Sequence, residues 1–145
     1  FRAAHHAAKT AIAAIQMDRY DEAALWPYNA AYKRTQGAKF AKLDMLQKFM
    51  TSSKPEQLEL MFTRGVISDA EMRQDPNAPK PSKVQQLKKA LRLIDNPSFM
   101  MRLMKVGIAT SKVAKHYEEF PETFDMNQFQ LWKDKTEKLF SVVRK

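Results

Sequence analysis

Residues 96–119, NPSFMMRLMKVGIATSKVAKHYEE, decide the fold class of this chain because both ends of a long helix can be recognised in them. Asn96 is suited to accept a free backbone N–H group of the first turn, and Pro97 fits the first helical position. Phe120-Pro121 ends the segment, because proline cannot continue a helix. The stretch therefore predicts a helix from residue 97 to about residue 119.

The remaining sequence consists of amphipathic segments of the same kind. Apolar spacing and breaker residues predict further helices over residues 4–26, 30–50, 54–64, 83–94 and from about residue 125 onward. Only three residues are glycine, which disfavours a turn-rich β fold, and no segment has the pattern of a strand. We therefore predict an all-α fold, a helical bundle of about six helices.

Short motifs mark where two of these helices begin. Ser53 with Glu56, and Ser82 with Gln85, fit the capping box. In that motif a serine hydroxyl accepts a first-turn N–H, and the later side chain accepts the N–H of the serine. Gly65 suits the left-handed residue that often follows the last turn of a helix.

A proline-rich stretch divides the chain. Residues 75–82, DPNAPKPS, hold three prolines and predict an extended connector. The connector separates an N-terminal three-helix unit, residues 1–74, from a C-terminal helical unit, residues 83–145. Because 145 residues is the size of one ordinary domain, we expect the two units to pack together.

Few residues are suited to catalysis or metal binding. The chain has no cysteine, and the adjacent His5 and His6 point to different faces of a predicted helix. His116 lies on a basic helix and is expected at the surface. The acidic pairs at 118/119 and 134/137 lie among lysines, at spacings typical of intrahelical ion pairs. We expect no catalytic, cofactor-binding or metal site, and no small-molecule substrate.

Positive charge is concentrated between residues 80 and 115, which carry +8 of the chain's net charge of +9. One interpretation is a solvated face; the others are contact with an acidic protein surface, anionic lipid headgroups or ribosomal RNA. RNA-binding surfaces interleave aromatic residues for stacking, and this stretch contains only Phe99, so nucleic acid is disfavoured.

We predict that the helices over 83–94 and 97–119 form the main docking surface. The basic residues expected to contact the partner are Lys88, Lys89, Arg92, Arg102, Lys105 and Lys112. An apolar stripe accompanies them, made of Leu87, Leu91, Ile94, Leu103 and Met104. Lysine stems can lie along such apolar neighbours while their ammonium groups reach acidic groups.

Residues 27–34, PYNAAYKR, resemble a Pro-x-Asn-Ala-Ala-Tyr-Arg-Lys segment of the alpha-subcomplex subunit 5 family of mitochondrial NADH:ubiquinone oxidoreductase (complex I). The similarity covers about residues 10–74, whereas residues 76–145 have no counterpart in that family. It implies a helical, non-catalytic accessory subunit on the matrix side of the inner membrane. The segment would then form a tight corner between the first two helices, made of Trp26, Pro27, Asn29 and Tyr32, with Trp26 buried.

The sequence thus predicts an accessory subunit of a mitochondrial inner-membrane respiratory-chain complex, complex I first, which packs against other protein subunits. Anionic lipid is a further expected contact. An accessory subunit of mitochondrial ATP synthase and a mitochondrial ribosomal protein are the alternatives. Residues 1–17 are free of acidic residues and resemble the tail of a mitochondrial transit peptide. No apolar run approaches the roughly 20 residues that span a bilayer, so we expect no membrane span.

Overall fold

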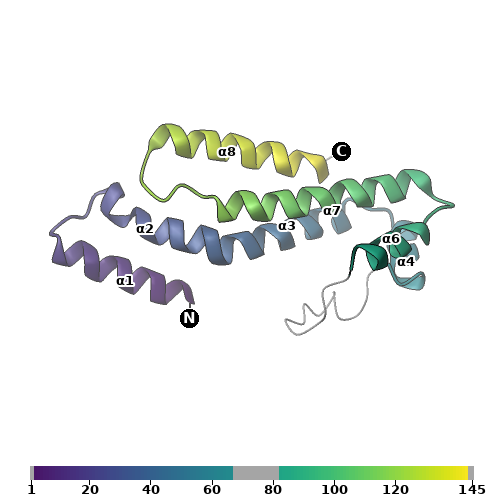
Figure 1. The fold of residues 1–145 in the computed structure, drawn as a ribbon, viewed down its shortest axis with the longest axis horizontal. Coiled ribbons are helices and arrows are strands. Elements are labelled where there is room, and N and C mark those ends of the chain that lie inside the picture. Colours follow the sequence, from purple (N-terminus) through teal and green to yellow (C-terminus); the bar gives the residue numbers. More distant parts are fainter. Residues whose placement is uncertain (1, 67–81, 144–145) are drawn as a thin grey trace.

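The computed structural model describes residues 2–66 and 82–143, and within these ranges the chain forms helices and no strand (Figure 1). One long rod joins α2 (Glu22–Tyr32), the π-helical turn η1 (Lys33–Gly37) and α3 (Ala38–Thr51). The other elements are α1 (Arg2–Gln16), α4 (Pro55–Thr63), α6 (Lys83–Leu91), α7 (Pro97–Glu118), α8 (Met126–Phe140) and the 3-10 turn η2 (Ser141–Val143). The predicted all-α fold of about six helices is confirmed. Apart from Ser82, the predicted connector at 75–82 lies outside the described residues.

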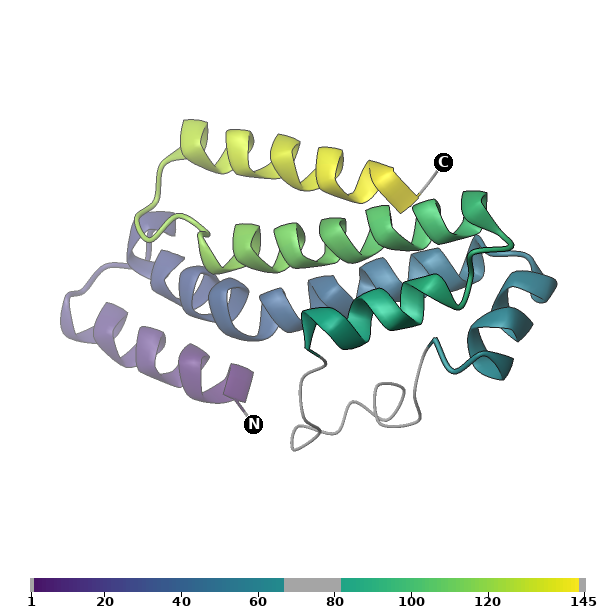
Figure 2. The ribbon, with the colours of Figure 1, turned by 45° about the vertical axis from the view of Figure 1, so that its right-hand side comes forward.

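The helices lie side by side in an elongated arrangement (Figures 1 and 2). The rod formed by α2, η1 and α3 runs the length of the molecule, and α7 packs antiparallel against α3. At one end α1 folds back along α2, and on the other side of α7 the chain returns as α8. The short helices α4 and α6 lie at the opposite end from α1.

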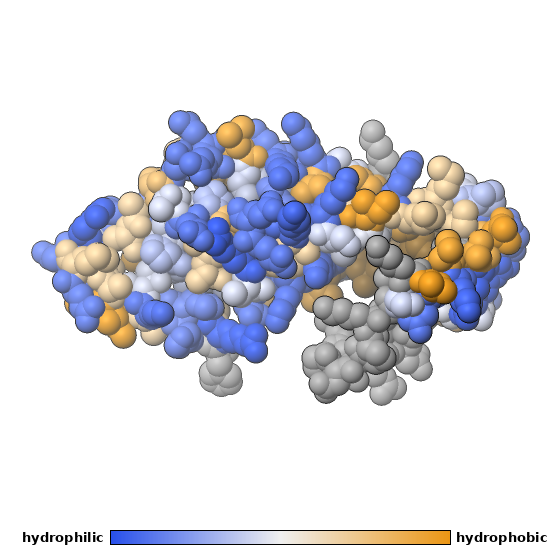
Figure 3. Space-filling view, viewed as in Figure 1, coloured by the Kyte–Doolittle hydropathy of each residue, from blue (hydrophilic) through white to orange (hydrophobic). Residues whose placement is uncertain are grey.

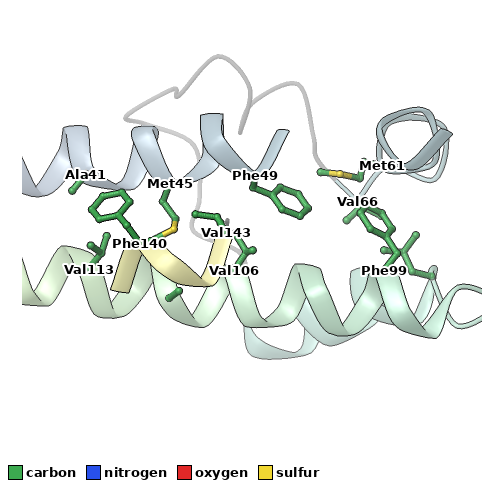
Figure 4. Packing of buried hydrophobic residues seen from close by; sticks show 12 residues of the cluster. Ala41, Met45, Phe49, Met61, Val66, Phe99, Val106, Val113, Phe140 and Val143 are labelled. Atoms are coloured by element: carbon green, nitrogen blue, oxygen red, sulfur yellow. The ribbon is translucent and has the colours of Figure 1, made fainter. Parts of the chain in front are cut away.

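The main hydrophobic core lies between α3 and α7 (Figure 4). Met45 and Phe49 of α3 face Val106 and Val113 of α7, and Phe140 closes this part of the core from the end of α8. Full burial of each such side chain contributes about 1.5–3 kcal/mol. Since α3 precedes the proline-rich stretch and α7 follows it, the two halves of the sequence share this core.

The first turn of the chain lies at residues 17–21, not at Pro27 as predicted. Asp18 has φ +49°, and Asp21 caps α2 by accepting the Ala24 N–H at 2.8 Å. Pro27 lies inside α2. Because proline has no backbone N–H, the carbonyl of Ala23 lacks its usual helical donor. Ala23 and Pro27 are both exposed, so water can bond that carbonyl instead. The predicted helix 4–26 and the predicted corner at Pro27 are therefore wrong.

Most of the other predicted helix ends are confirmed. Ser82 and Gln85 form the predicted capping box, with N···O distances of 2.8 and 3.2 Å. Asn96 accepts the Phe99 N–H ahead of Pro97, and Asp125 caps α8. The α4 cap differs, because Pro55 starts that helix and the cap position falls on residue 54. The Lys54 N–H donates to Gln57 Oε1 at 3.1 Å, whereas Ser53 Oγ donates to the Phe49 carbonyl.

Gly65 has the left-handed conformation predicted for it, with φ +58°, and a Cβ atom there would lie 2.9 Å from Nη1 of Arg92. We expect Gly65→Ala to lower the free energy of unfolding by about 1–2 kcal/mol, the cost of the left-handed region for a residue with a side chain. Urea unfolding followed by circular dichroism measures the change.

The matched control for this prediction is Gly107→Ala. Gly107 lies inside α7, and a Cβ atom there meets nothing within 4 Å. We expect this variant to be more stable than the original chain by about 0.5–1 kcal/mol, because alanine restricts the unfolded chain and favours the helix. A stabilising effect of Gly65→Ala would contradict the left-handed conformation at that position.

Candidate docking surface

The six basic residues predicted to dock a partner lie at separate places. Lys88 and Lys89 are on α6, and Arg92 follows that helix. The remaining three lie along α7: Arg102, Lys105 and Lys112. These positions place the residues over a length of the molecule rather than in one compact patch.

Arg92 and Arg102 bind their own chain. Arg92 Nη1 donates to the carbonyls of Arg64 and Gly65 at 2.8 and 3.0 Å, so this side chain ties the turn after α4 to the end of α6. Arg102 Nη2 donates to Ser52 Oγ at 2.7 Å, and its guanidinium carbon lies 5.2 Å from the centre of the Phe49 ring. Both arginines therefore stabilise the fold, and their guanidinium groups are already hydrogen-bonded within the chain.

Lys105 and Lys112 lie beside a groove between α7 and α8, with a volume of about 340 Å³. Residues three, four and seven positions apart share one face of a helix, and the residues that line each side of the groove have this spacing. The rims of the groove are formed by four exposed lysines: Lys105, Lys112, Lys135 and Lys138. Its floor is apolar: Ile108 and Ala109 from α7, and Leu139 and Val142 from α8 and η2.

The four groove lysines are not neutralised within the described part of the chain. Among residues 2–66 and 82–143, the ion pairs involve other cations, such as Lys48 with Asp44 and Lys115 with Glu119. Four positive charges around one groove raise the local potential and attract anionic groups. The sequence prediction missed Lys135 and Lys138, which contribute half of the charge of this site.

An exposed apolar band continues from the groove along α7 and over α6. Figure 3, drawn from the same side as Figure 1, shows apolar surface gathered over the half of this face that holds α6. Each side chain of the band is at least half exposed: Val84, Leu87, Leu91, Ile94, Met101, Met104 and Ile108. In the predicted stripe, Leu103 instead packs half-buried against the core. The other predicted members belong to the apolar band.

No protein-family model, curated protein or solved structure matches this chain. The resemblance of residues 10–74 to a complex I subunit family therefore stays a prediction. None of the described helices is long and apolar enough to cross a membrane. Within the same residues, no three His, Asp or Glu side chains come together as metal ligands would.

Of the four residues predicted to form a corner, Trp26 instead joins α2 to the segment between α7 and α8. Trp26 is 5% exposed, so its predicted burial is confirmed. Its ring stacks on Phe120 with centroids 5.2 Å apart, and its Nε1 donates to the Pro121 carbonyl at 2.9 Å. Pro27 and Asn29 are exposed within α2, and Tyr32 is half-buried where α2 continues into η1, so the chain does not turn back at any of them.

His116 is buried, contrary to the prediction that it lies at the surface. It is 4% exposed, its ring stacks on Trp132 at 5.0 Å, and its Nε2 lies 3.0 Å from the Trp132 carbonyl. Trp132 Nε1 in turn donates to the His116 carbonyl at 3.1 Å. The spacing of Ala109, Val113, His116 and Phe120, all buried, was the signal in the sequence that could have placed this ring inside.

This burial predicts a pH dependence of stability. Desolvation lowers the pKa of His116, and Lys135 adds to this, whereas the hydrogen bond with Trp132 and the charge of Glu119 oppose it. The unfolded chain, whose histidine has a pKa near 6.5, therefore binds the proton first as the pH falls. We expect stability to decrease from pH 7.5 to 5.5, by at most about 1.4 kcal/mol per pH unit for one proton.

The variant His116→Gln isolates this contribution, since glutamine can donate to the Trp132 carbonyl and does not titrate. Urea unfolding at pH 7.5 and at pH 5.5 gives, for each protein, the loss in free energy of unfolding on acidification. We expect this loss to be smaller in the variant than in the original chain, whatever the variant's absolute stability. Equal differences in the two proteins would contradict a neutral, buried His116.

Proposed function

We propose that this chain is a non-catalytic accessory subunit that docks onto other protein subunits by the face formed by α6, α7 and the end of α8. The observation that supports this is the apolar band, which continues into a groove rimmed by four lysines. Contiguous apolar surface with a polar rim is typical of protein interaction sites. Its exposed side chains are aliphatic or methionine, without the aromatic residues used to stack nucleic acid bases, so a protein partner is favoured over RNA.

We further propose that the assembly is a respiratory-chain complex of the mitochondrial inner membrane, bound from the matrix side, with complex I as the first candidate. This placement is supported by the sequence alone, through the resemblance of residues 10–74 to a complex I subunit family. Mitochondrial ATP synthase and the mitochondrial ribosome are the alternative assemblies.

The test is a native gel of mitochondria solubilised in mild detergent and probed with an antibody against this chain. We expect the chain to migrate with an inner-membrane respiratory complex, and mass spectrometry of that band names which one. Migration as a free protein of its own mass would contradict the subunit role. Migration with the ribosome would contradict the proposed assembly.

A further inference from the structure

We infer that the groove between α7 and α8 binds an acidic amphipathic helix of a partner protein. This inference rests on the proposed docking function and specifies the chemistry of the partner. The groove offers two kinds of contact at once, an apolar floor and lysines along both rims. A helix with an apolar face flanked on both sides by Asp or Glu complements both.

The length of the site suits a helix. Lys105 and Lys112 are two helical turns apart on α7, a distance of about 10 Å. The exposed Met101 and Met104 extend the apolar surface toward the start of the same helix. From Met101 to Lys112 the surface is therefore about 16 Å long, which corresponds to three turns of a partner helix.

The shape of the groove favours a partner helix over a membrane surface. Ala109 is buried and Leu139 is half-buried, so this part of the floor is recessed between the exposed lysines, whereas Ile108 and Val142 are exposed. A flat layer of lipid headgroups reaches the ammonium groups and leaves the recessed floor uncovered. Side chains of a helix can enter the groove, as in the packing of ridges into grooves between helices. The observations therefore favour a protein helix over anionic lipid.

The charges act together rather than singly. Exposed ion pairs each contribute little, but a lysine pair on either side of the groove steers an acidic helix into it and fixes its orientation. Binding is therefore expected to weaken as salt rises, because exposed charges are screened.

The experiment uses the purified full chain and a synthetic probe. The probe is a fluorescein-labelled helical peptide of about 14 residues, or four turns, with leucines along one face and glutamates on both flanks. A second peptide carries lysines in place of the glutamates. Phosphatidylcholine vesicles containing phosphatidylglycerol serve as the lipid probe. Fluorescence anisotropy measures peptide binding, and co-sedimentation measures vesicle binding.

Two charge-reversal variants are compared, with the same total change of charge. The groove variant replaces its four lysines: Lys105→Glu, Lys112→Glu, Lys135→Glu and Lys138→Glu. The control variant replaces four exposed lysines that do not line the groove: Lys9→Glu, Lys39→Glu, Lys42→Glu and Lys54→Glu. All eight side chains are exposed, so both variants are expected to fold, which circular dichroism checks.

We expect the acidic peptide to bind the original chain, and the groove variant to lose at least about tenfold in affinity. The control variant should stay within about twofold of the original chain at moderate salt. The uncharged change Ile108→Gln should also weaken binding, because it removes an apolar contact from the floor. The lysine-bearing peptide should not bind.

Three results would overturn the inference: no binding of the acidic peptide, equal losses in both variants, or vesicle binding that needs the groove lysines without peptide binding. The native gel is independent of these measurements. A chain that migrates with a complex but does not bind the acidic peptide refutes the groove inference alone. A chain that migrates freely refutes the proposed function.

Discussion

Replacing Trp26 with alanine is expected to lower the free energy of unfolding by about 3–5 kcal/mol, the usual cost of removing a buried tryptophan. The ring stacks on Phe120 and meets Phe124 and Phe129 edge-on at 5.3 Å each. The change also leaves the Pro121 carbonyl without its donor. Domains of this size are stable by only about 5–15 kcal/mol, so the loss is a large share of the total. Chemical unfolding followed by circular dichroism measures it.

Two further variants separate the contributions at this position. Trp26→Phe keeps one aromatic ring but removes the N–H donor and the second ring of the indole, so we expect an intermediate loss of about 1–3 kcal/mol. Tyr20→Ala removes an aromatic ring that is mostly exposed, and should change stability by less than about 0.5 kcal/mol. An unchanged midpoint for Trp26→Ala would contradict the role of the aromatic cluster in holding α2 against the α7–α8 connection.

The double variant Leu87→Glu/Leu91→Glu is expected to abolish incorporation into the assembly while leaving the fold intact. Both side chains are more than half exposed on α6, so their replacement costs the free chain little. The partner has about half of each side chain left to cover, which contributes about 1 kcal/mol per residue, and burying a carboxylate in its place costs several kcal/mol more. The double change therefore weakens association at least about a hundredfold. Co-migration on the native gel reports incorporation, and thermal unfolding of the purified variant reports the fold.

The matched control is Ile12→Glu/Ile15→Glu. These two side chains are 57% and 63% exposed, close to the 60% and 51% of Leu87 and Leu91, but they lie on α1, at the opposite end of the molecule from α6. We expect this variant to enter the assembly normally. Equal incorporation of the two double variants would show that the band is not the docking surface.

The sequence predicts helix ends correctly where the cap depends only on neighbouring residues. Asn96 with Pro97, and Ser82 with Gln85, cap their helices through contacts within four residues, which the sequence itself displays. The first turn of the chain does not lie at Pro27, because the carbonyl that loses its N–H partner belongs to the exposed Ala23 and can bond water. The turn at residues 17–21 instead depends on Asp21, whose side chain accepts the Ala24 N–H and starts α2.

The candidate site depends on packing that the sequence does not display. His116 is buried because α8 returns over α7 and brings Trp132 onto its ring. The same return places Lys135 and Lys138 opposite Lys105 and Lys112 across the groove. The charge of the sequence between residues 80 and 115 therefore indicates the rim on α7 but not the rim on α8.

The two arginines illustrate the same limit. Arg92 and Arg102 belong to the basic stretch, and their charge alone favoured a role in docking. In the structure both side chains donate hydrogen bonds to backbone carbonyls that are distant in sequence. The acceptors are 27 and 28 residues away from Arg92 and 50 residues away from Arg102. Such partners can be identified only once the helices are packed.

Oxidative footprinting of methionines tests the docking face most directly. Met101 and Met104 lie in the apolar band and are 55% and 50% exposed, whereas Met17 and Met126, at 55% and 57%, lie outside it and serve as internal controls. Exposed methionines oxidise readily to the sulfoxide, and mass spectrometry gives the rate at each position for the free and the assembled chain. We expect assembly to protect Met101 and Met104 and to leave the oxidation rates of Met17 and Met126 unchanged. Protection of Met17 and Met126, with Met101 and Met104 still oxidised at the rate of the free chain, would contradict it.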